Sequence, residues 1–327
     1  MRQFVRRLIF LLISSATLLM TAWIILLFRV ESPGPLQDVR AVIIESGSSS
    51  YEIAQKLEQE GVIDSSLWFL LYLKSYFAHT SLKAGEYGFV PQQNIRSVIE
   101  RLVSGAVIEH SITIPEGLTT AQILSIISAI PNMEGEVPQN APEGVYLPET
   151  YYYRYGDKRG ELLERMQDEQ AKIIDELWQK RDPDLPIKTP EEAIILASIV
   201  EKETGVADER ARVSAVFINR LRKGMRLQSD PTVVYGLTKG SGVLDRPITL
   251  IDLQAPSPYN TYLISGLPPL PIANPGKAAI EAVLHPMDTD ELYFVADGTG
   301  GHRFAKTLEE HNRNVQYWRQ VRRQNAQ

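Results

Sequence analysis

The sequence comprises 327 residues, 44% of them hydrophobic and 23% charged, which is typical of a folded protein with two or three domains. Its formal net charge of -6 at pH 7 argues against a nucleic-acid-binding protein, because contacts to phosphates need a basic surface. The absence of cysteine excludes a disulfide framework, a thiol nucleophile and lipid attachment through cysteine.

The N-terminal segment has the composition of a membrane span. Residues 8–28 carry no charge, and their number is about what a helix needs to cross a hydrocarbon core of roughly 30 Å. Three arginines precede this run and one follows it closely, so the positive-inside rule predicts a cytoplasmic tail at residues 1–7. A cleavable signal peptide is the competing interpretation, but the apolar run is longer than such peptides use and ends without an A-x-A-like site. We expect an uncleaved anchor, with the rest of the chain outside the cytoplasm.

A short linker containing Pro and Gly, residues 29–38, is predicted to separate the span from a small α+β module at residues 39–109. Within this module, residues 39–45 favour a strand, and residues 51–60 favour a helix that ends at a glycine. A later helix is expected near residues 95–103.

The second predicted domain, residues 110–327, is also of mixed α+β type. A long amphipathic helix is expected at residues 160–178. Toward the end of the chain, residues 292–296 and 302–304 are predicted to form a hairpin around a Gly-rich turn. The predicted fold class is therefore α+β, with a single N-terminal transmembrane helix.

The most informative stretch is residues 189–205. Thr189 is a natural N-cap with a proline directly after it, and Glu192 stands where it would complete a capping box. Residues 193–200 are apolar except for one serine, which is more than an amphipathic stripe, so we expect a helix buried on nearly all sides. Such a helix delivers Glu201 from the protein interior.

Glu201 is the candidate catalytic residue. Burial disfavours the charged form of a carboxyl group and raises its pKa, as a general acid working near neutral pH requires. Glu203 is the obvious rival, but two residues on a helix point about 200° apart, so only one of the pair is expected to face a cleft. The plainer alternative is that both glutamates are solvated and pair with Lys202 or Arg210.

Two polar segments are candidates for ligand binding. Residues 228–232 (QSDPT) follow an amphipathic helix predicted at residues 211–222 and are expected to form a loop that faces the end of the buried helix. Residues 256–271 are dense in Pro and Gly, and their YNTY run at 259–262 combines flat aromatic rings with hydrogen-bonding groups, a combination suited to sugars. The structural alternative is an irregular loop packed on the core.

Other chemistries find little support in the sequence. The five histidines are scattered and none forms an H-E-x-x-H pair, so no metal site is predicted. No G-x-S-x-G elbow of a serine hydrolase appears. The Gly-rich turn at residues 297–301 lacks the GK[ST] of a phosphate loop, which argues against nucleotide binding. We therefore predict no cofactor and a lone carboxylate as the reacting group.

Five motifs occur together in the second half of the chain. They are ASIVEKET at residues 197–204, VFINRL at 216–221, QSDPT at 228–232, YNTY at 259–262 and GLPP at 266–269. Together they resemble the endolytic murein transglycosylases, the YceG-like family, and the resemblance extends over nearly the whole chain. One departure is Leu270, which stands where the family usually has a glycine.

The resemblance implies a protein anchored in the bacterial inner (plasma) membrane by one helix, with a LysM-like module before a catalytic domain in the extracytoplasmic part. The family cleaves the bond between N-acetylmuramic acid and N-acetylglucosamine within nascent glycan strands of peptidoglycan, which terminates strand elongation. The first glutamate of its S-I-[IV]-E-K-E motif is catalytic, and this residue is Glu201 here. Glycan strands are the implied substrate, and a peptidoglycan synthase is a candidate partner.

By the logic of the family, Glu201 protonates the glycosidic oxygen and then, as a carboxylate, removes the proton from the muramic acid's C6 hydroxyl while that oxygen attacks C1. The product is a 1,6-anhydro sugar, and no second acid is needed because the nucleophile is already tethered. The candidates for positioning the glycan are Gln228, Asp230, Tyr259, Asn260 and Thr261. Asp230 has a turn-capping role as its alternative.

Two other functions stay open at this point. One is a conventional two-carboxylate muramidase, in which Asp230, Asp252 or Glu149 would be the partner of Glu201 and water would enter the product. The other is a non-enzymatic wall-binding or division scaffold, in which Glu201 only ends a helix. Product chemistry separates the first alternative, and the behaviour of a Glu201→Gln protein separates the second.

Overall fold

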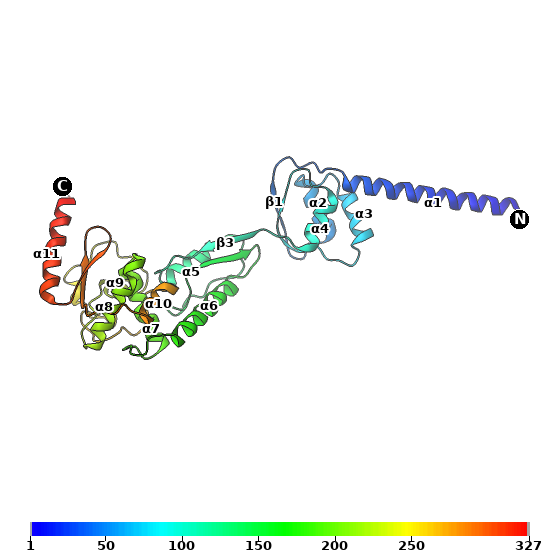
Figure 1. Cartoon of the computed structure of the whole chain (residues 1–327). Coiled ribbons are helices and arrows are strands. Elements are labelled where there is room, and N and C mark those ends of the chain that lie inside the picture. Colours follow the sequence, from blue (N-terminus) through cyan, green and yellow to red (C-terminus); the bar gives the residue numbers. More distant parts are fainter. Residues whose placement is uncertain (1, 326–327) are drawn as a thin grey trace. The chain divides into compact units, whose positions relative to one another are not determined.

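The computed structural model describes residues 2–325, and its chain divides into two compact units (Figure 1). Unit 1 comprises the described residues up to 110 together with 152–156, and unit 2 comprises 111–151 and 157–325. Strands β3 (Glu109–Thr113) and β4 (Thr150–Arg154) form a two-stranded sheet where the chain passes from one unit to the other. The secondary structure is mixed α+β, as predicted.

Helix α1 (Arg2–Glu31) is the one helix among residues 2–325 that is long and apolar enough to cross a membrane, judged by length and composition. Its C-terminal end packs on unit 1, where Leu26 and Val30 are buried, and the Glu31 carboxylate accepts a hydrogen bond from Arg96 at 2.9 Å. Leu36 is buried in the same core. Residues 29–38 therefore do not form the free linker that was predicted, because their apolar side chains complete the core of the module.

The rest of unit 1 runs in the order strand, helix, helix, strand, helix. These elements are β1 (Arg40–Ile44), α2 (Ser50–Gln59), α3 (Ser66–Tyr76), β2 (Gly85–Phe89) and α4 (Ile95–Ser104). The two strands are antiparallel, with Val42 opposite Tyr87. Ser49 caps α2 in a capping box with Glu52, and Gly105 ends α4 in the left-handed conformation.

Unit 2 is built mainly from helices. They are α5 (Thr120–Ser128), α6 (Arg159–Gln179), α7 (Pro190–Glu203), α8 (Arg210–Arg222), α9 (Asp230–Thr238), α10 (Lys277–Leu284) and α11 (Leu308–Asn325), with short 3-10 turns η1 (Ala207–Glu209) and η2 (Asp252–Gln254). Helix α7 packs against α6, α8, α9 and α10 and lies at the centre of this unit (Figure 1).

The buried helix predicted from the apolar run is confirmed as α7. Residues 195–200 are all buried, including Ser198, whose hydroxyl donates to the Ile195 carbonyl and accepts from the Ile272 amide. Thr189 caps the helix by accepting from the Glu192 amide at 3.2 Å, whereas the Glu192 carboxylate bonds to the Lys188 amide. One half of the predicted capping box is therefore formed. In the other half, the Glu192 carboxylate accepts from the amide of Lys188, one residue before the N-cap.

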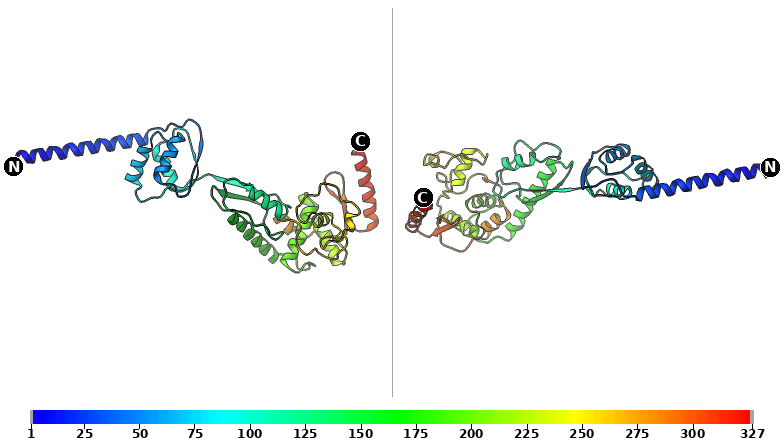
Figure 2. Two further views of the ribbon diagram at one scale, coloured as in Figure 1. Left: turned by 180° about the vertical axis from the view of Figure 1, so that it is seen from behind. Right: turned by 90° about the horizontal axis from the view of Figure 1, so that it is seen from above.

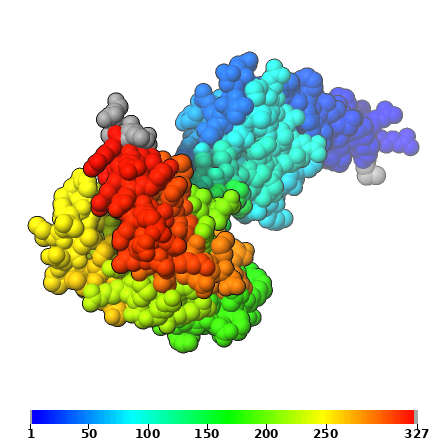
Figure 3. Space-filling model, turned by 60° about the vertical axis from the view of Figure 1, so that its left-hand side comes forward, coloured from blue at the N-terminus to red at the C-terminus, as the bar shows by residue number. Residues whose placement is uncertain are grey.

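A hairpin and a helix end the chain. Strand β5 (Tyr293–Ala296) pairs antiparallel with β6 (His302–Ala305), which confirms the predicted hairpin. Helix α11 packs on both strands, and the two views of Figure 2 show the three elements together at one edge of unit 2. In the space-filling view α11 (red) covers part of that edge (Figure 3).

Candidate functional site

Glu201 lies in the last turn of α7, directly after the fully buried Ile199 and Val200. Its side chain is only 6% exposed, and its Oε2 accepts a hydrogen bond from the Gly276 amide at 3.0 Å. Gly276 precedes α10, so the N-terminal end of that helix holds one carboxylate oxygen in place. Glu201 is therefore not the solvated residue of the plainer alternative, although the ion pair with Arg210 that this alternative named is present at 3.7 Å.

A second carboxylate and a guanidinium accompany Glu201. Arg210, at the start of α8, places Nη2 3.7 Å from Glu201 Oε1 and 3.8 Å from Glu116 Oε2. The side chain of Arg210 is 13% exposed, whereas that of Glu116 is 44% exposed. Glu116 was not predicted to belong to the site, because it lies far from Glu201 in the sequence. Arg210 was named only as a possible ion-pair partner of a solvated glutamate.

Two backbone segments form the wall behind Glu201. The Gly117 amide donates to the Asn274 carbonyl at 3.0 Å, and the Asn274 amide donates to the Leu118 carbonyl at 2.8 Å. Lys202 Nζ donates to the Gly117 carbonyl at 3.0 Å. Gly117 has φ +74°, a conformation that favours glycine, and it lies close to Cγ of Glu201.

The side chain of Asn274 fastens this wall to the rest of unit 2. Its Oδ1 accepts from the Tyr146 amide at 2.9 Å, and its Nδ2 donates to the Leu118 carbonyl, Thr120 Oγ1 and Glu143 Oε1 at 3.0–3.2 Å. Glu143 also accepts from the Tyr235 hydroxyl at 3.0 Å. Burial raises the pKa of Glu143, whereas the hydrogen bonds from Thr120 and Tyr235 act in the opposite direction.

The environment raises the pKa of Glu201. Burial is the largest cause, and the negative charge of Glu116 acts in the same direction. The Gly276 amide, the Arg210 guanidinium and the Lys202 ammonium act in the opposite direction, because each favours the charged carboxylate. The net effect favours a neutral carboxyl group, which is the form that can donate a proton.

Glu203 points to a different partner, as the helical spacing predicted. Its Oε1 accepts a hydrogen bond from the Ser229 hydroxyl at 2.5 Å, and burial raises its pKa to about 7. The loop predicted at residues 228–232 thus meets the end of α7 at Glu203. From Asp230 onward this segment is helix α9, which the prediction missed although a Ser-Asp-Pro start signal was present.

Three of the predicted binding residues have side chains open to a ligand. The side chain of Gln228 is exposed, and its backbone has φ +50°. The backbone N–H of Gln228 donates a hydrogen bond to the Thr261 carbonyl at 3.1 Å. Asp230 is exposed, and its Oδ1 accepts from the Tyr262 hydroxyl at 2.6 Å. Tyr259 is partly buried, with its ring centroid 4.8 Å from that of Tyr235.

The other two predicted binding residues, Asn260 and Thr261, are buried. Asn260 Nδ2 donates to the carbonyls of Leu253 and Ala255 at 3.1 and 2.8 Å. Thr261 Oγ1 accepts from the Ser229 amide at 2.9 Å and pairs with a threonine hydroxyl of α9. In this conformation both side chains support the loop that carries Tyr259 and leave no polar group facing a ligand.

A cavity of about 280 Å³ lies beside the end of α7 in unit 2. Its lining consists of Thr119, Lys202, Asp230, Pro231, Val234, Tyr235, Gly242 and Ile272. Lys202 is the neighbour of Glu201 in the chain, and Asp230 follows the loop held by Glu203. The cavity is therefore a candidate binding hollow next to the candidate acid.

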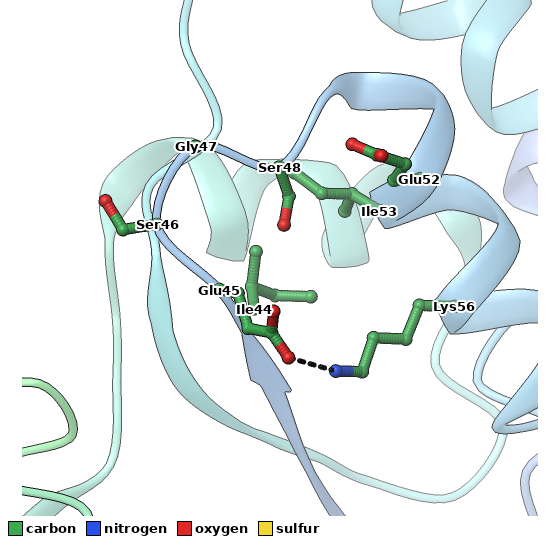
Figure 4. Close-up of a pocket in the computed structure, with 8 residues that line it drawn as sticks. All are labelled: Ile44, Glu45, Ser46, Gly47, Ser48, Glu52, Ile53 and Lys56. Carbon is green, nitrogen blue, oxygen red and sulfur yellow. Dashed lines mark ion pairs between the residues drawn. The ribbon is translucent and has the colours of Figure 1, made fainter.

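Unit 1 has a hollow of its own. A pocket of about 390 Å³ opens between the end of β1 and the start of α2 and is lined by Ile44, Glu45, Ser46, Gly47, Ser48, Glu52, Ile53 and Lys56 (Figure 4). Across it, Lys56 Nζ lies 3.8 Å from Glu45 Oε1. Its lining is rich in serine hydroxyls and charged groups.

A buried carboxyl group with a raised pKa is typical of enzymes that use general acid catalysis. The chain belongs to the YceG-like family, whose model matches residues 42–317.

Named relatives and a solved structure agree with this assignment. The chain is 33% identical over 301 residues to the endolytic murein transglycosylase of Bacillus subtilis strain 168, covering 83% of this chain and 82% of that protein. It is 30% identical to the endolytic murein transglycosylase of Streptococcus pneumoniae strain R6, of which it covers 57%. A 2.6 Å crystal structure of a yceG-like protein from Listeria monocytogenes matches with a TM-score of 0.50 and 33% identity, covering 85% of this chain and 99% of that one.

Proposed function

We propose that the protein is a peptidoglycan lytic transglycosylase that cuts the bond between N-acetylmuramic acid and N-acetylglucosamine within glycan strands, with Glu201 as its general acid and then its base. The observation that carries this proposal is the buried Glu201 carboxyl group, whose pKa is raised and whose Oε2 is held by the Gly276 amide. The names of the relatives support the substrate and the reaction class.

In the proposed reaction, neutral Glu201 gives its proton to the glycosidic oxygen as the bond from that oxygen to C1 of the muramic acid breaks. The Glu201 carboxylate then takes the proton of the C6 hydroxyl while the C6 oxygen bonds to C1. Glu201 ends the cycle protonated, and the product carries a 1,6-anhydro ring. Because the C6 hydroxyl belongs to the sugar itself, ring closure needs no water.

The glycan is proposed to bind at the cavity beside α7, whose lining includes the exposed Asp230. Gln228, which is exposed, and Tyr259, which is partly exposed, are further candidates for contact with the glycan. Asn260 and Thr261 hold the loop that presents Tyr259. We further propose that α1 anchors the protein in the bacterial inner membrane with unit 1, a LysM-like module, and unit 2 on the outer side. In that place the enzyme ends the elongation of nascent strands, with a peptidoglycan synthase as a candidate partner.

A two-carboxylate muramidase is the second, weaker candidate. Glu116 shares Arg210 with Glu201 and is a second carboxylate at the site, but it lies beside Glu201 and not across a sugar from it. The partners expected from the sequence fit less well. Asp252 is locked by two hydrogen bonds from Arg246, at 2.6 and 2.9 Å, which hold its pKa well below the usual range. Asp230 is engaged with the Tyr262 hydroxyl.

The test is digestion of purified, uncrosslinked glycan strands by the full chain in detergent, with mass spectrometry of the new ends. Glu201→Gln is the test variant, and Glu191→Gln is its matched control, since Glu191 is exposed in the first turn of the same helix, about 15 Å away along the helix axis. We expect 1,6-anhydro ends from the wild type and from Glu191→Gln, and none from Glu201→Gln.

Other outcomes select the alternatives. Reducing ends would identify a hydrolase with a second reacting carboxylate. Absence of cleavage by the wild type, on strands that a control muramidase cuts, would identify a wall-binding scaffold.

A further inference from the structure

Arg210 is a shared partner of two carboxylates and is committed to neither. Its Nη2 lies 3.7 Å from Glu201 Oε1 and 3.8 Å from Glu116 Oε2, so both are ion pairs longer than a direct hydrogen bond. Its Nε is buried and has no hydrogen-bond partner among residues 2–325. The guanidinium therefore interacts with both carboxylates. If one carboxylate is removed, the positive charge acts on the other alone.

Glu116 and Glu201 lie on the same wall of the site. The Gly276 amide donates to Glu201 Oε2, and a side chain added at Gly276 would overlap the Glu116 carboxylate. Both carboxylates thus touch one residue and one guanidinium nitrogen. In two-carboxylate glycosidases the acid and its partner flank the sugar from opposite faces. The side-by-side placement here fits an electrostatic neighbour of the acid better than a nucleophile or base across from it.

We propose that Glu116 is a positioning residue for the reaction: by sharing Arg210, it favours the neutral form of Glu201, with the transferable proton on Oε1. The assignment of the proton follows from the contacts, because Oε2 already accepts a hydrogen bond from the Gly276 amide, whereas the contact of Oε1 with Arg210 Nη2 is a longer ion pair of 3.7 Å. This inference rests on the proposed role of Glu201 as the acid.

The direction of the effect follows from the charges that face Glu201. They are Glu116 from the 116–118 segment, Arg210 from α8, Lys202 from α7 and the Gly276 amide before α10. Glu116 is the one negative group in this set, and it raises the pKa of Glu201. Without its charge, the positive groups act on Glu201 alone, so the carboxyl group ionises at lower pH and the supply of neutral acid fails earlier as pH rises.

The experiment is a set of pH profiles of kcat/KM for strand cleavage by the full chain in detergent. Glu116→Gln should still produce 1,6-anhydro ends, with near wild-type activity at acidic pH. Its alkaline limb should move to lower pH, so that the ratio of the rate at a pH on this limb to the rate on the acidic plateau falls about threefold or more. Glu116→Asp, which keeps the charge, and Glu191→Gln, which removes a distant one from α7, should both keep the wild-type ratio.

Gly276→Ala provides a second route that leaves the charge of the chain unchanged. Gly276 has φ -73°, which alanine adopts without strain, and the added methyl group would displace the Glu116 carboxylate. The alkaline limb of the Gly276→Ala profile should move in the same direction as that of Glu116→Gln. If one of the two variants folds poorly, the other still tests the inference.

Two results would overturn the inference. A Glu116→Gln profile that superimposes on the wild type would show that Glu116 does not act on Glu201. Loss of cleavage at every pH by folded Glu116→Gln would show that Glu116 takes part in the chemistry itself. A fully active Glu201→Gln protein would instead refute the proposed function, so the two failures are distinguishable.

Discussion

Replacing Glu203 with glutamine should remove a large part of the pH dependence of stability. Glu203 accepts a hydrogen bond from Ser229, and burial raises its pKa to about 7 from the ordinary value of 4.5. The charge of Asp230 raises this pKa further, whereas His302 and Arg220 lower it. The folded protein thus holds this proton more tightly than the unfolded chain does.

The sign follows from which state holds the proton. Below pH 4.5 both states are protonated and the full stability is present. As pH rises from 4.5 to about 7, the unfolded chain releases the proton while the folded protein keeps it, so the free energy of unfolding falls. Above pH 7 the loss is complete, and a shift of this size corresponds to about 3 kcal/mol. Glutamine stays neutral, so the variant should be more stable than the wild type by up to about 3 kcal/mol at pH 8 and equal to it near pH 4.

Urea unfolding between pH 4 and pH 8 measures this difference. Replacing Trp23 and Trp68 of unit 1 with phenylalanine leaves Trp178 and Trp318, so fluorescence then reports unit 2. Glu191→Gln is the control, because it makes the same substitution at an exposed position of α7. Parallel pH curves for Glu203→Gln and the wild type would refute the reasoning.

Two further perturbations test what stabilises each unit by itself. Removal of residues 2–31 takes away the two buried apolar side chains of α1, each worth about 1.5–3 kcal/mol, whereas removal of residues 2–22 leaves them. Urea unfolding of unit 1 should therefore show a lower midpoint for the longer deletion, and equal midpoints would show that the end of α1 does not support the module. Asn274→Ala removes four hydrogen bonds, each worth about 1 kcal/mol and more where a buried partner is left unpaired, so unit 2 should lose about 3–6 kcal/mol. The buried Asn219, which donates two hydrogen bonds to the 289–291 segment, is the control: Asn219→Ala should cost less in thermal unfolding, and an equal cost would contradict the role given to Asn274.

Structural features that a short stretch of sequence determines by itself were predicted well. The apolar run before Glu201 allowed only a buried helix, and α7 is that helix. The Gly-rich turn between residues 297 and 301, with a strand-like segment on each side, predicted the β5–β6 hairpin. In both cases local pattern and tertiary packing agree, so the local signal was sufficient.

Features that depend on burial by distant residues were predicted poorly. The 29–38 segment contains Pro and Gly and looked like a linker, but Leu36 and Val30 find apolar partners in unit 1. Asn260 and Thr261 were chosen as sugar-binding residues by their chemistry. Their hydrogen-bonding groups are instead used within the loop and by α9, and nothing local distinguishes a polar group that meets solvent from one that meets a backbone carbonyl.

The site itself shows the same division. Glu201 could be named from the sequence because its own helix determines its burial. Its pKa is raised mainly by burial and further by Glu116, against the opposing effects of Arg210 and the Gly276 amide, and these three groups come from other parts of the chain. The place of the proposed acid is thus a local property of α7, whereas the set of groups that shifts its pKa is a tertiary property of unit 2. If Glu201 is the acid, a substitution at Glu116 or Gly276 should therefore shift the pH range of cleavage without abolishing cleavage.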